Sequence, residues 1–215
     1  MSLMIRTLTF SMLLLALVGC SKSNQAKNVL DAAIEKKIRD LVEQLASENS
    51  PPTGDGWPGL DYPKDWDSEK QKIVYDAKRK LGDFGKSAFP ILLESSGDSR
   101  YSLTASYSIE VNHSVGEVCE QIIENNVRLI GICYKSRTGT DGEWHMCPNY
   151  FSAKHNGDLN GWWRANKNKS LKQMRIDVLK WRIEQEGQIG FPDDESRKSY
   201  MDELHEKLAE VESSA

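Results

Sequence analysis

Six side chains that could bind a metal or attack a substrate lie between residues 113 and 155. They are His113, Cys119, Cys133, His145, Cys147 and His155. Structural zinc sites use pairs of ligands that are two to four residues apart, and only His145 and Cys147 are spaced so closely. This spacing argues against a zinc site, and we expect neither a metal nor a cofactor.

A cysteine–histidine nucleophile pair is the second chemistry that these residue types could supply. Sequence spacing alone does not bring any of these thiols into contact with a histidine, and a free thiol in an oxidising compartment is readily oxidised. Asp141, Glu143 and His145 are also close in sequence, but a solvated turn is the commoner reason for such a cluster, because acid–base catalysis depends on separation in space. The chain contains neither Gly-x-Ser-x-Gly nor His-Glu-x-x-His. We therefore assign no catalytic residue and favour a protein that is not an enzyme.

Aromatic and cationic side chains are frequent between residues 137 and 164. A candidate binding surface there consists of Trp144, Tyr150, Trp162, Trp163, Arg137 and Arg164. Trp, Tyr and Arg are the usual anchors of protein interfaces. Two interpretations remain open: the aromatic rings form an exposed contact surface, or they fill the space between a loop and the helices, which is the commoner case. A similar choice applies to Trp57, Tyr62 and Trp66 in an earlier loop: the rings either hold that loop against the domain or form an exposed contact surface.

The first 20 residues carry a separate signal. Arg6 precedes an apolar run from Leu8 to Val18, which is too short to span ~30 Å of hydrocarbon comfortably and has the layout of a secretory signal. The residues Leu17-Val18-Gly19-Cys20 resemble the lipobox of bacterial lipoproteins in residue type, order and distance from the start. The resemblance implies cleavage before Cys20 and attachment of a thioether lipid, with fatty-acid chains such as palmitate, to its sulfur.

The lipobox resemblance also implies a domain organisation and a location. Residues 1–19 would be a lipoprotein signal peptide, residues 20–27 a lipidated tether and residues 28–215 a single helical domain. Ser21 rather than Asp follows the cysteine, which in a Gram-negative cell implies the outer membrane, facing the periplasm. No second apolar run of membrane length follows in the sequence, so the N-terminal lipid would be the only anchor.

The overall charge bears on the partners that the domain could have. The formal net charge is −4, whereas proteins that bind nucleic acid usually carry a basic excess. We therefore expect no nucleic acid as partner. The expected partners are the membrane, through the lipid, and another envelope protein.

Three cysteines remain once Cys20 carries a lipid, and export would make a disulfide possible. If residues 114–134 form one helix, Cys119 and Cys133 are about 21 Å apart, far beyond the ~7 Å between Cα atoms that a disulfide allows. Cys147 would then be the partner of either Cys119 or Cys133. We expect the Cys133–Cys147 bond, because Cys119 lies on the apolar face and suits a buried thiol.

Helical periodicity of apolar residues dominates the sequence after residue 27. We predict helices over 28–47, 68–81, 87–95, 114–130, 170–186 and from Asp193 or Asp194 to about Val211. Ser114 with Glu117 and Ser170 with Gln173 have the form of capping boxes. Residues 103–111 are either a helix end or a short strand. Residues 48–66 form a Pro/Gly loop, and residues 135–161 a loop-rich insertion that could include one hairpin at Asp141-Gly142.

The expected fold class is mainly α: a small irregular domain of about five to six helices with one α–α hairpin. Residues 67–95 resemble a single HEAT-type helical repeat, through Leu81-Gly82, Gly85, and Ala88 two residues before Pro90. There is no second copy at about 40-residue spacing, so the resemblance supports a helix pair and not an array.

Three hypotheses for function follow. The first is a lipid-anchored, non-catalytic domain that binds another envelope protein. The second is an envelope enzyme that acts on cell-wall or glycan material through residues 137–164. The third, protection against a toxin, has no residue in the sequence that would test it.

Overall fold

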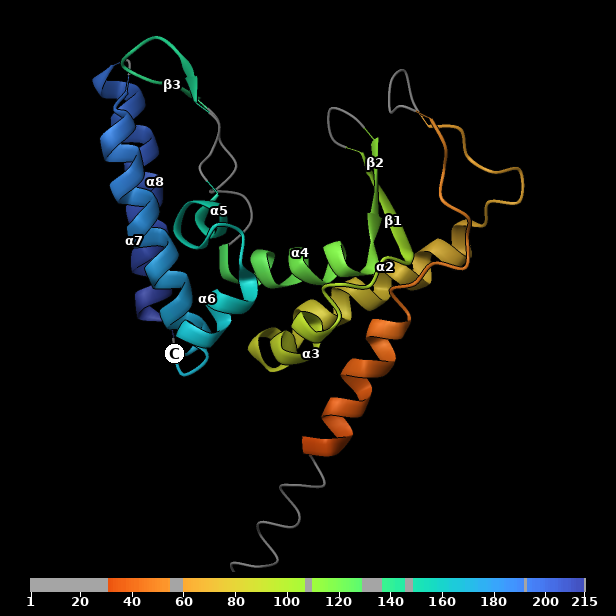
Figure 1. Ribbon diagram of the computed structural model, residues 1–215. Coiled ribbons are helices and arrows are strands. Elements are labelled where there is room, and N and C mark those ends of the chain that lie inside the picture. The colour runs from red at the N-terminus through yellow and green to blue at the C-terminus, as the bar shows by residue number, and fades with distance from the viewer. Residues whose placement is uncertain are drawn as a thin grey trace, which may run out of the picture. The chain divides into compact units, whose positions relative to one another are not determined.

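The computed structural model describes residues 31–54, 60–106, 110–128, 137–145, 149–191 and 193–214 (Figure 1). The chain divides into two compact units, Met1–Asp40 and Leu41–Ala215. Helices form most of the described chain, and the two sheets that the structure describes have two strands each. The predicted mainly-α fold class is therefore confirmed. No described helix is both long enough and apolar enough to cross a membrane.

The first described helix covers residues 31–43, within the predicted span of 28–47. It ends earlier than predicted because the backbone tightens into a turn. The N–H of Leu45 donates to the carbonyl of Val42 at 3.0 Å, and that of Ala46 donates to the carbonyl of Glu43 at 3.2 Å. Residues 28–30 lie outside the described part of the chain.

The predicted helix pair is present as α2 (Ser68–Asp83), a short 3-10 turn η1 (Gly85–Ala88) and α3 (Phe89–Glu94). The Asp67 carboxylate caps α2 by accepting from the N–H groups of Glu69 and Lys70. Gly85 adopts a φ of +54° between the two helices, a conformation that favours glycine. Pro90 lies in the first turn of α3, where its missing N–H costs least.

α4 (Val115–Arg128) is the central helix that its apolar sequence predicts. It contacts α2, α3 and α7, and its apolar face, which includes Val118, Cys119 and Ile123, is fully buried. The capping box at its start is confirmed: Ser114 N–H donates to Glu117 at 2.7 Å, and Glu117 N–H donates to Ser114 Oγ at 3.2 Å.

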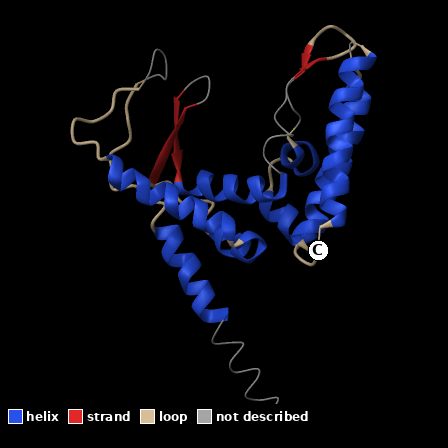
Figure 2. Ribbon diagram, turned by 180° about the vertical axis from the view of Figure 1, so that it is seen from behind, coloured by secondary structure: helices blue, strands red, loops and turns tan. Residues whose placement is uncertain are grey.

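The described residues of the segment 103–111 belong to two strands rather than to one element. β1 (Tyr101–Ser106) pairs antiparallel with β2 (Glu110–Ser114), with Thr104 opposite Asn112. The strand alternative was thus the right one, although its alternation was assigned to a single strand that includes residues 107–109, which lie outside the described part. A second, smaller hairpin joins β3 (Arg137–Thr138) to β4 (Trp144–His145), as the Asp141-Gly142 turn predicts (Figure 2).

Two helices that were not predicted begin within the segment 135–161, which we expected to be loop-rich. The segment includes α5 (Tyr150–His155) and the start of α6 (Leu159–Asn166). These helices have only six and eight residues, which is too short for a repeated apolar pattern to be recognised in the sequence. Their starts are set by the side chains of Asn149 and Asp158, which accept from first-turn N–H groups.

The last two helices, α7 (Leu171–Ile189) and α8 (Asp194–Ser213), pack against each other. α7 runs through Gly187, where we predicted its end, and stops at Gly190, which has a φ of +78°. Only half of its capping box forms, because Ser170 Oγ accepts from Gln173 N–H while the Gln173 amide donates to Asp177.

Candidate binding site

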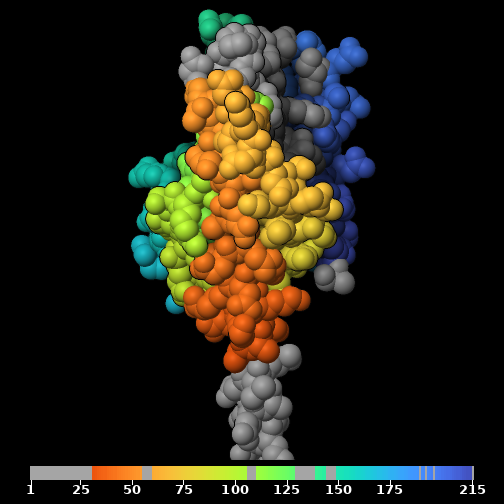
Figure 3. Space-filling model, turned by 90° about the vertical axis from the view of Figure 1, so that its right-hand side faces the viewer, coloured from red at the N-terminus to blue at the C-terminus, as the bar shows by residue number. Residues whose placement is uncertain are grey.

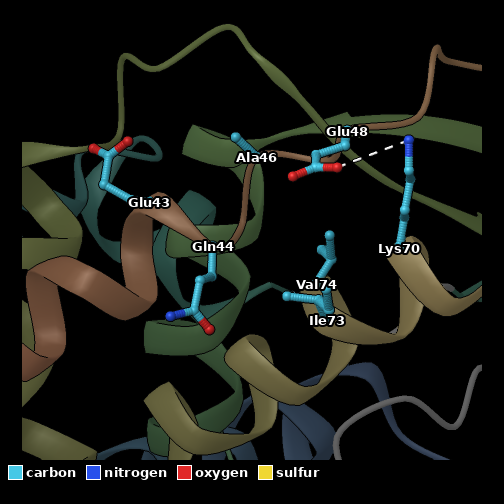
Figure 4. A pocket seen from close by; sticks show the side chains of 7 residues that line it. All are labelled: Glu43, Gln44, Ala46, Glu48, Lys70, Ile73 and Val74. Atoms are coloured by element: carbon cyan, nitrogen blue, oxygen red, sulfur yellow. Dashed lines mark ion pairs between the residues drawn. The ribbon is translucent and has the colours of Figure 1, made fainter.

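A solvent-open hollow lies between α2 and the turn that follows residue 43. The two segments are side by side on one face of the molecule, with α2 in yellow in Figure 3. The hollow has a volume of about 220 Å³. It is lined by Glu43, Gln44, Ala46, Glu48, Lys70, Ile73 and Val74. Figure 4 shows Ile73 and Val74 between Gln44 on one side and the Glu48–Lys70 pair on the other.

The position of the hollow follows from the amphipathic pattern of α2. Val74 faces the core and is 1% exposed, whereas Ile73, one residue earlier on the helix, is 53% exposed. Ala46, from the turn, supplies further apolar surface. The floor is therefore apolar, and one large aliphatic side chain at its edge is left in contact with water.

Charged groups surround this floor, and each has an oppositely charged neighbour. Lys70 Nζ is 3.8 Å from Glu48 Oε2, with both side chains well exposed. Glu43 accepts from Arg100 Nη1 at 2.9 Å. Ion pairs that are this exposed are screened by water and contribute little to the stability of the fold. A binding partner can therefore displace them at little cost.

The size of the hollow limits what it can hold. Clefts that bury a whole small molecule usually enclose about 300–1,000 Å³, more than is present here. An apolar floor with a charged rim resembles the centre of a protein interface on a small scale. The arrangement suits a single apolar side chain from another protein.

An aromatic face lies on α2, β1 and the loop before α2, and consists of Tyr62, Trp66, Tyr75 and Tyr101. The Tyr62 and Trp66 rings meet edge to face at 4.8 Å. Tyr75 donates its hydroxyl proton to the carbonyl of Thr104 at 3.2 Å. Burial raises the pKa of Tyr62 and of Tyr101. These contacts hold the loop to the β1–β2 hairpin, and this role explains the position of Trp66. Tyr62 and Tyr75 remain 46% and 48% exposed.

His113, one of the histidines singled out in the sequence, lies at the junction of β2 and α4. Its ring contacts the Gln121 amide at 3.2 Å, and Gln121 in turn accepts from Lys78 at 2.9 Å. Glu117 lies 3.8 Å from His113 Nδ1. Burial lowers the pKa of His113; Glu117 opposes this shift and Lys78 adds to it. Burial also lowers the pKa of Lys78.

The structure separates the members of the predicted surface at residues 137–164. Trp162 is only 1% exposed, and its ring packs against Phe89 and Phe151 at 6.3 and 5.1 Å. It fills the core, so its assignment to a binding surface is wrong. Trp163 is half-buried, and its ring meets Phe89 edge to face at 5.7 Å.

Tyr150 lies in a polar group that links α5 to α7. Its ring contacts His155 and Trp181 at 5.7 and 5.2 Å. Burial raises the pKa of Tyr150, and Asp177 adds to the shift. Asp177 accepts from Lys169 at 2.8 Å. Burial also lowers the pKa of His155, aided by Lys154 and Lys169 and opposed by Asp158.

The structure describes the side chains of only some of the remaining predicted site residues. Arg164 is exposed, with its Nη2 3.7 Å from Asp158. The side chains of Arg137 and Trp144 lie outside the described part of the chain, as do Cys20, Cys133 and Cys147. The lipidation site and the expected disulfide therefore stay predictions. Cys119 is a buried free thiol. Among the described residues, no group of three or more His, Cys, Asp or Glu side chains could hold a metal ion.

A cationic surface at the turn between α6 and α7 was not predicted from the sequence. We call this surface the basic turn; its members are Lys86, Arg164, Lys167, Lys169 and Lys172. A signal for it was present, because residues 159–176 contain five Lys or Arg, Arg175 included, and no Asp or Glu. Lys86 could not be assigned in this way, since it reaches the turn from η1 only in the folded chain.

Comparisons with protein-family models, with curated proteins and with solved structures find no match to this chain.

Proposed function

We propose that the protein is a lipid-anchored envelope protein whose helical domain is non-catalytic and binds another envelope protein through the hollow beside α2. The observation that carries the binding role is Ile73, which is 53% exposed at the edge of an apolar floor. Burying a side chain of this size contributes roughly 1.5–3 kcal/mol. The lipobox residues Leu17 to Cys20 support the anchor.

Photo-crosslinking tests the binding role. A photoreactive amino acid at position 73 should give a protein adduct in intact cells, and the same residue at position 111 should not. Val111 is the matched control, because it is a large aliphatic residue on β2 with 38% exposure. Adducts of equal yield from both positions would show that the hollow has no specific partner.

A charge at the hollow should then weaken the complex. Ile73→Asp should lower capture of the crosslinked partner at least roughly tenfold, the equivalent of about 1.4 kcal/mol, while Val111→Asp should leave it unchanged. Unchanged capture by Ile73→Asp would contradict the assignment of the hollow.

Fatty-acid labelling tests the anchor. Cells grown with labelled palmitate should incorporate label into the wild-type chain and not into Cys20→Ala, and the variant should leave the membrane fraction. If the label does not join the protein and the variant stays with the membrane, the lipid anchor is refuted.

The alternative is an envelope enzyme that acts on cell-wall or glycan material through residues 137–164. The observation in its favour is the group of Tyr150, His155, Lys169 and Asp177, since phenol, imidazole, amine and carboxylate are the groups that general acid–base catalysis uses. Release of soluble fragments from purified cell wall, lost in Tyr150→Phe at unchanged stability, would establish it. Equal release with and without the protein would exclude it.

A further inference from the structure

The five cations of the basic turn come from three helices and one turn that the fold brings together. Arg164 belongs to α6, Lys167 and Lys169 to the turn that follows, and Lys172 to α7. Lys86 joins them from η1, because its Nζ donates to the carbonyl of Lys169 at 2.6 Å. The side chain of Arg164 is 73% exposed and that of Lys169 is 43% exposed.

Only part of this positive charge is matched by nearby carboxylates. In the described chain, Asp158 lies 3.7 Å from Arg164 and Asp177 lies 2.8 Å from Lys169. Lys172 and Lys86 donate to backbone carbonyls, which leave their charges in place. The basic turn thus has an excess of three positive charges, although the whole chain has a net charge of −4.

A tryptophan lies beside these cations. Trp163 is half-buried, and Lys86 Nζ lies 5.8 Å from the centre of its ring. The ring also meets Phe89 edge to face. Tryptophan next to lysine and arginine is typical of surfaces that rest at the headgroup level of a bilayer, where the amphipathic ring is favoured.

We propose that the basic turn contacts anionic phospholipid headgroups of the membrane that carries the protein, as a second and electrostatic membrane contact. This inference rests on the proposed lipid anchor at Cys20. The 22 residues from Cys20 to Leu41 would span at most roughly 80 Å even if all were extended. The anchor therefore keeps the larger unit close to the bilayer, so that weak contacts become effective through high local concentration. Nucleic acid, the other common anionic partner, has no such tether to hold it near.

Charge sets the expected strength of the contact. One lysine or arginine near an anionic leaflet contributes about a fivefold factor in partitioning. Removal of the three excess charges should therefore weaken binding roughly a hundredfold. Raised salt should weaken it as well, because exposed charges are screened.

Vesicle sedimentation measures this binding without the lipid. The mature chain, residues 20–215 with Cys20→Ser, should bind phosphatidylcholine vesicles that contain about a third phosphatidylglycerol, and should bind pure phosphatidylcholine far more weakly. The triple variant Arg164→Gln, Lys167→Gln, Lys172→Gln should lose roughly a hundredfold in partitioning. Its circular dichroism spectrum should match that of the parent.

A matched control separates the basic turn from net charge. Lys72→Gln, Arg79→Gln and Lys198→Gln together remove the same charge from exposed positions elsewhere and should leave the binding within roughly twofold of the parent. An equal loss in both triple variants would overturn the proposal, as would equal binding to both kinds of vesicle. Tighter binding to single-stranded RNA than to the anionic vesicles would assign the surface to nucleic acid instead.

These outcomes are independent of the palmitate experiment. If palmitate does not join Cys20 but the basic turn still binds anionic vesicles, the anchor is refuted while the surface stands. If palmitate is incorporated but the vesicles do not bind the unlipidated chain, the anchor stands and the basic turn is not a membrane contact.

Discussion

His113 lies among polar groups from two helices, with Lys78 on α2 and both Glu117 and Gln121 on α4. Burial holds the pKa of its ring below the value of an exposed histidine. The unfolded chain therefore binds a proton at His113 more readily than the folded chain does. Stability from this group is fully present above the unfolded pKa of about 6.5 and is lost as the pH falls from there through the lower folded pKa.

We expect His113→Gln to reduce the pH dependence of stability over that range. The free energy of unfolding of the wild type should fall between about pH 7.5 and about pH 5, and the fall should be smaller in the variant. Urea titrations at the two pH values measure it. His205→Gln, an exposed position on α8, is the control, and an unchanged slope in His113→Gln would contradict the argument.

At the scale of elements, two glycines inside helices have opposite surroundings. A Cβ at Gly116 in α4 would lie 2.2 Å from the carbonyl oxygen of Ser96, which is backbone and cannot move aside cheaply. A Cβ added at Gly187 in α7 would meet open space, with no neighbouring atom within 4 Å outside its own helix turn. The first glycine is required by the close approach of a neighbouring turn, and the second only weakens its helix.

Gly116→Ala should therefore lower the free energy of unfolding by more than about 2 kcal/mol, as overpacking does. Gly187→Ala should raise it by about 0.5–1 kcal/mol, because alanine is the better helix former. Denaturant unfolding of both variants provides the measurement. Equal effects of the same sign would contradict the close approach of Ser96 to α4.

The capping box of α4 gives a second prediction for elements. Ser114→Ala removes the acceptor for the Glu117 N–H and should cost about 1 kcal/mol. Ser87→Ala, at an exposed serine within η1, is the control and should change stability by less than about 0.5 kcal/mol. A neutral Ser114→Ala would mean that water replaces the cap without loss.

The elements also show what the sequence could predict. α2 and α4 were found because each combines a capping side chain with a long apolar periodicity, signals that lie within one segment. α5 and α6 were missed because six and eight residues are too few for a repeated apolar pattern, and the burial of Phe151 and Trp162 is apparent only in the folded chain. The hollow was missed for a related reason: Glu48 and Ile73 are far apart in sequence, and only the packing of α2 brings them to one place.

At the scale of the whole molecule, the proposed lipid anchor would place the chain in an oxidising compartment, where the state of each cysteine can be tested. Cys119 is fully buried, and burial raises the pKa of its thiol to about 12. It should stay a thiol in an oxidising compartment, because the thiolate is the reactive form. The expected Cys133–Cys147 bond concerns residues outside the described part of the chain.

Peptide mass mapping of the protein isolated from its native cells should find Cys133 joined to Cys147 and Cys119 unalkylated until the chain is unfolded. Cys147→Ala should lower the free energy of unfolding by about 3 kcal/mol without reductant and should equal the wild type with reductant. A bond between Cys119 and Cys133 would contradict both the pairing and the continuous helix over 114–134 from which it was inferred, whereas a Cys119–Cys147 bond would contradict the pairing alone.

The buried ion pair between Arg182 and Glu186 on α7 limits which substitutions homologues can carry at these two positions. Both side chains are only 1% exposed, and Arg182 also donates to the hydroxyl of Tyr200 at 3.0 Å. Loss of one partner would strand a charge in the interior at a cost of about 3–5 kcal/mol, whereas joint replacement by apolar residues of similar volume is often tolerated. Natural homologues should therefore carry both charges or neither, and positions 182 and 186 should change together along any line of descent.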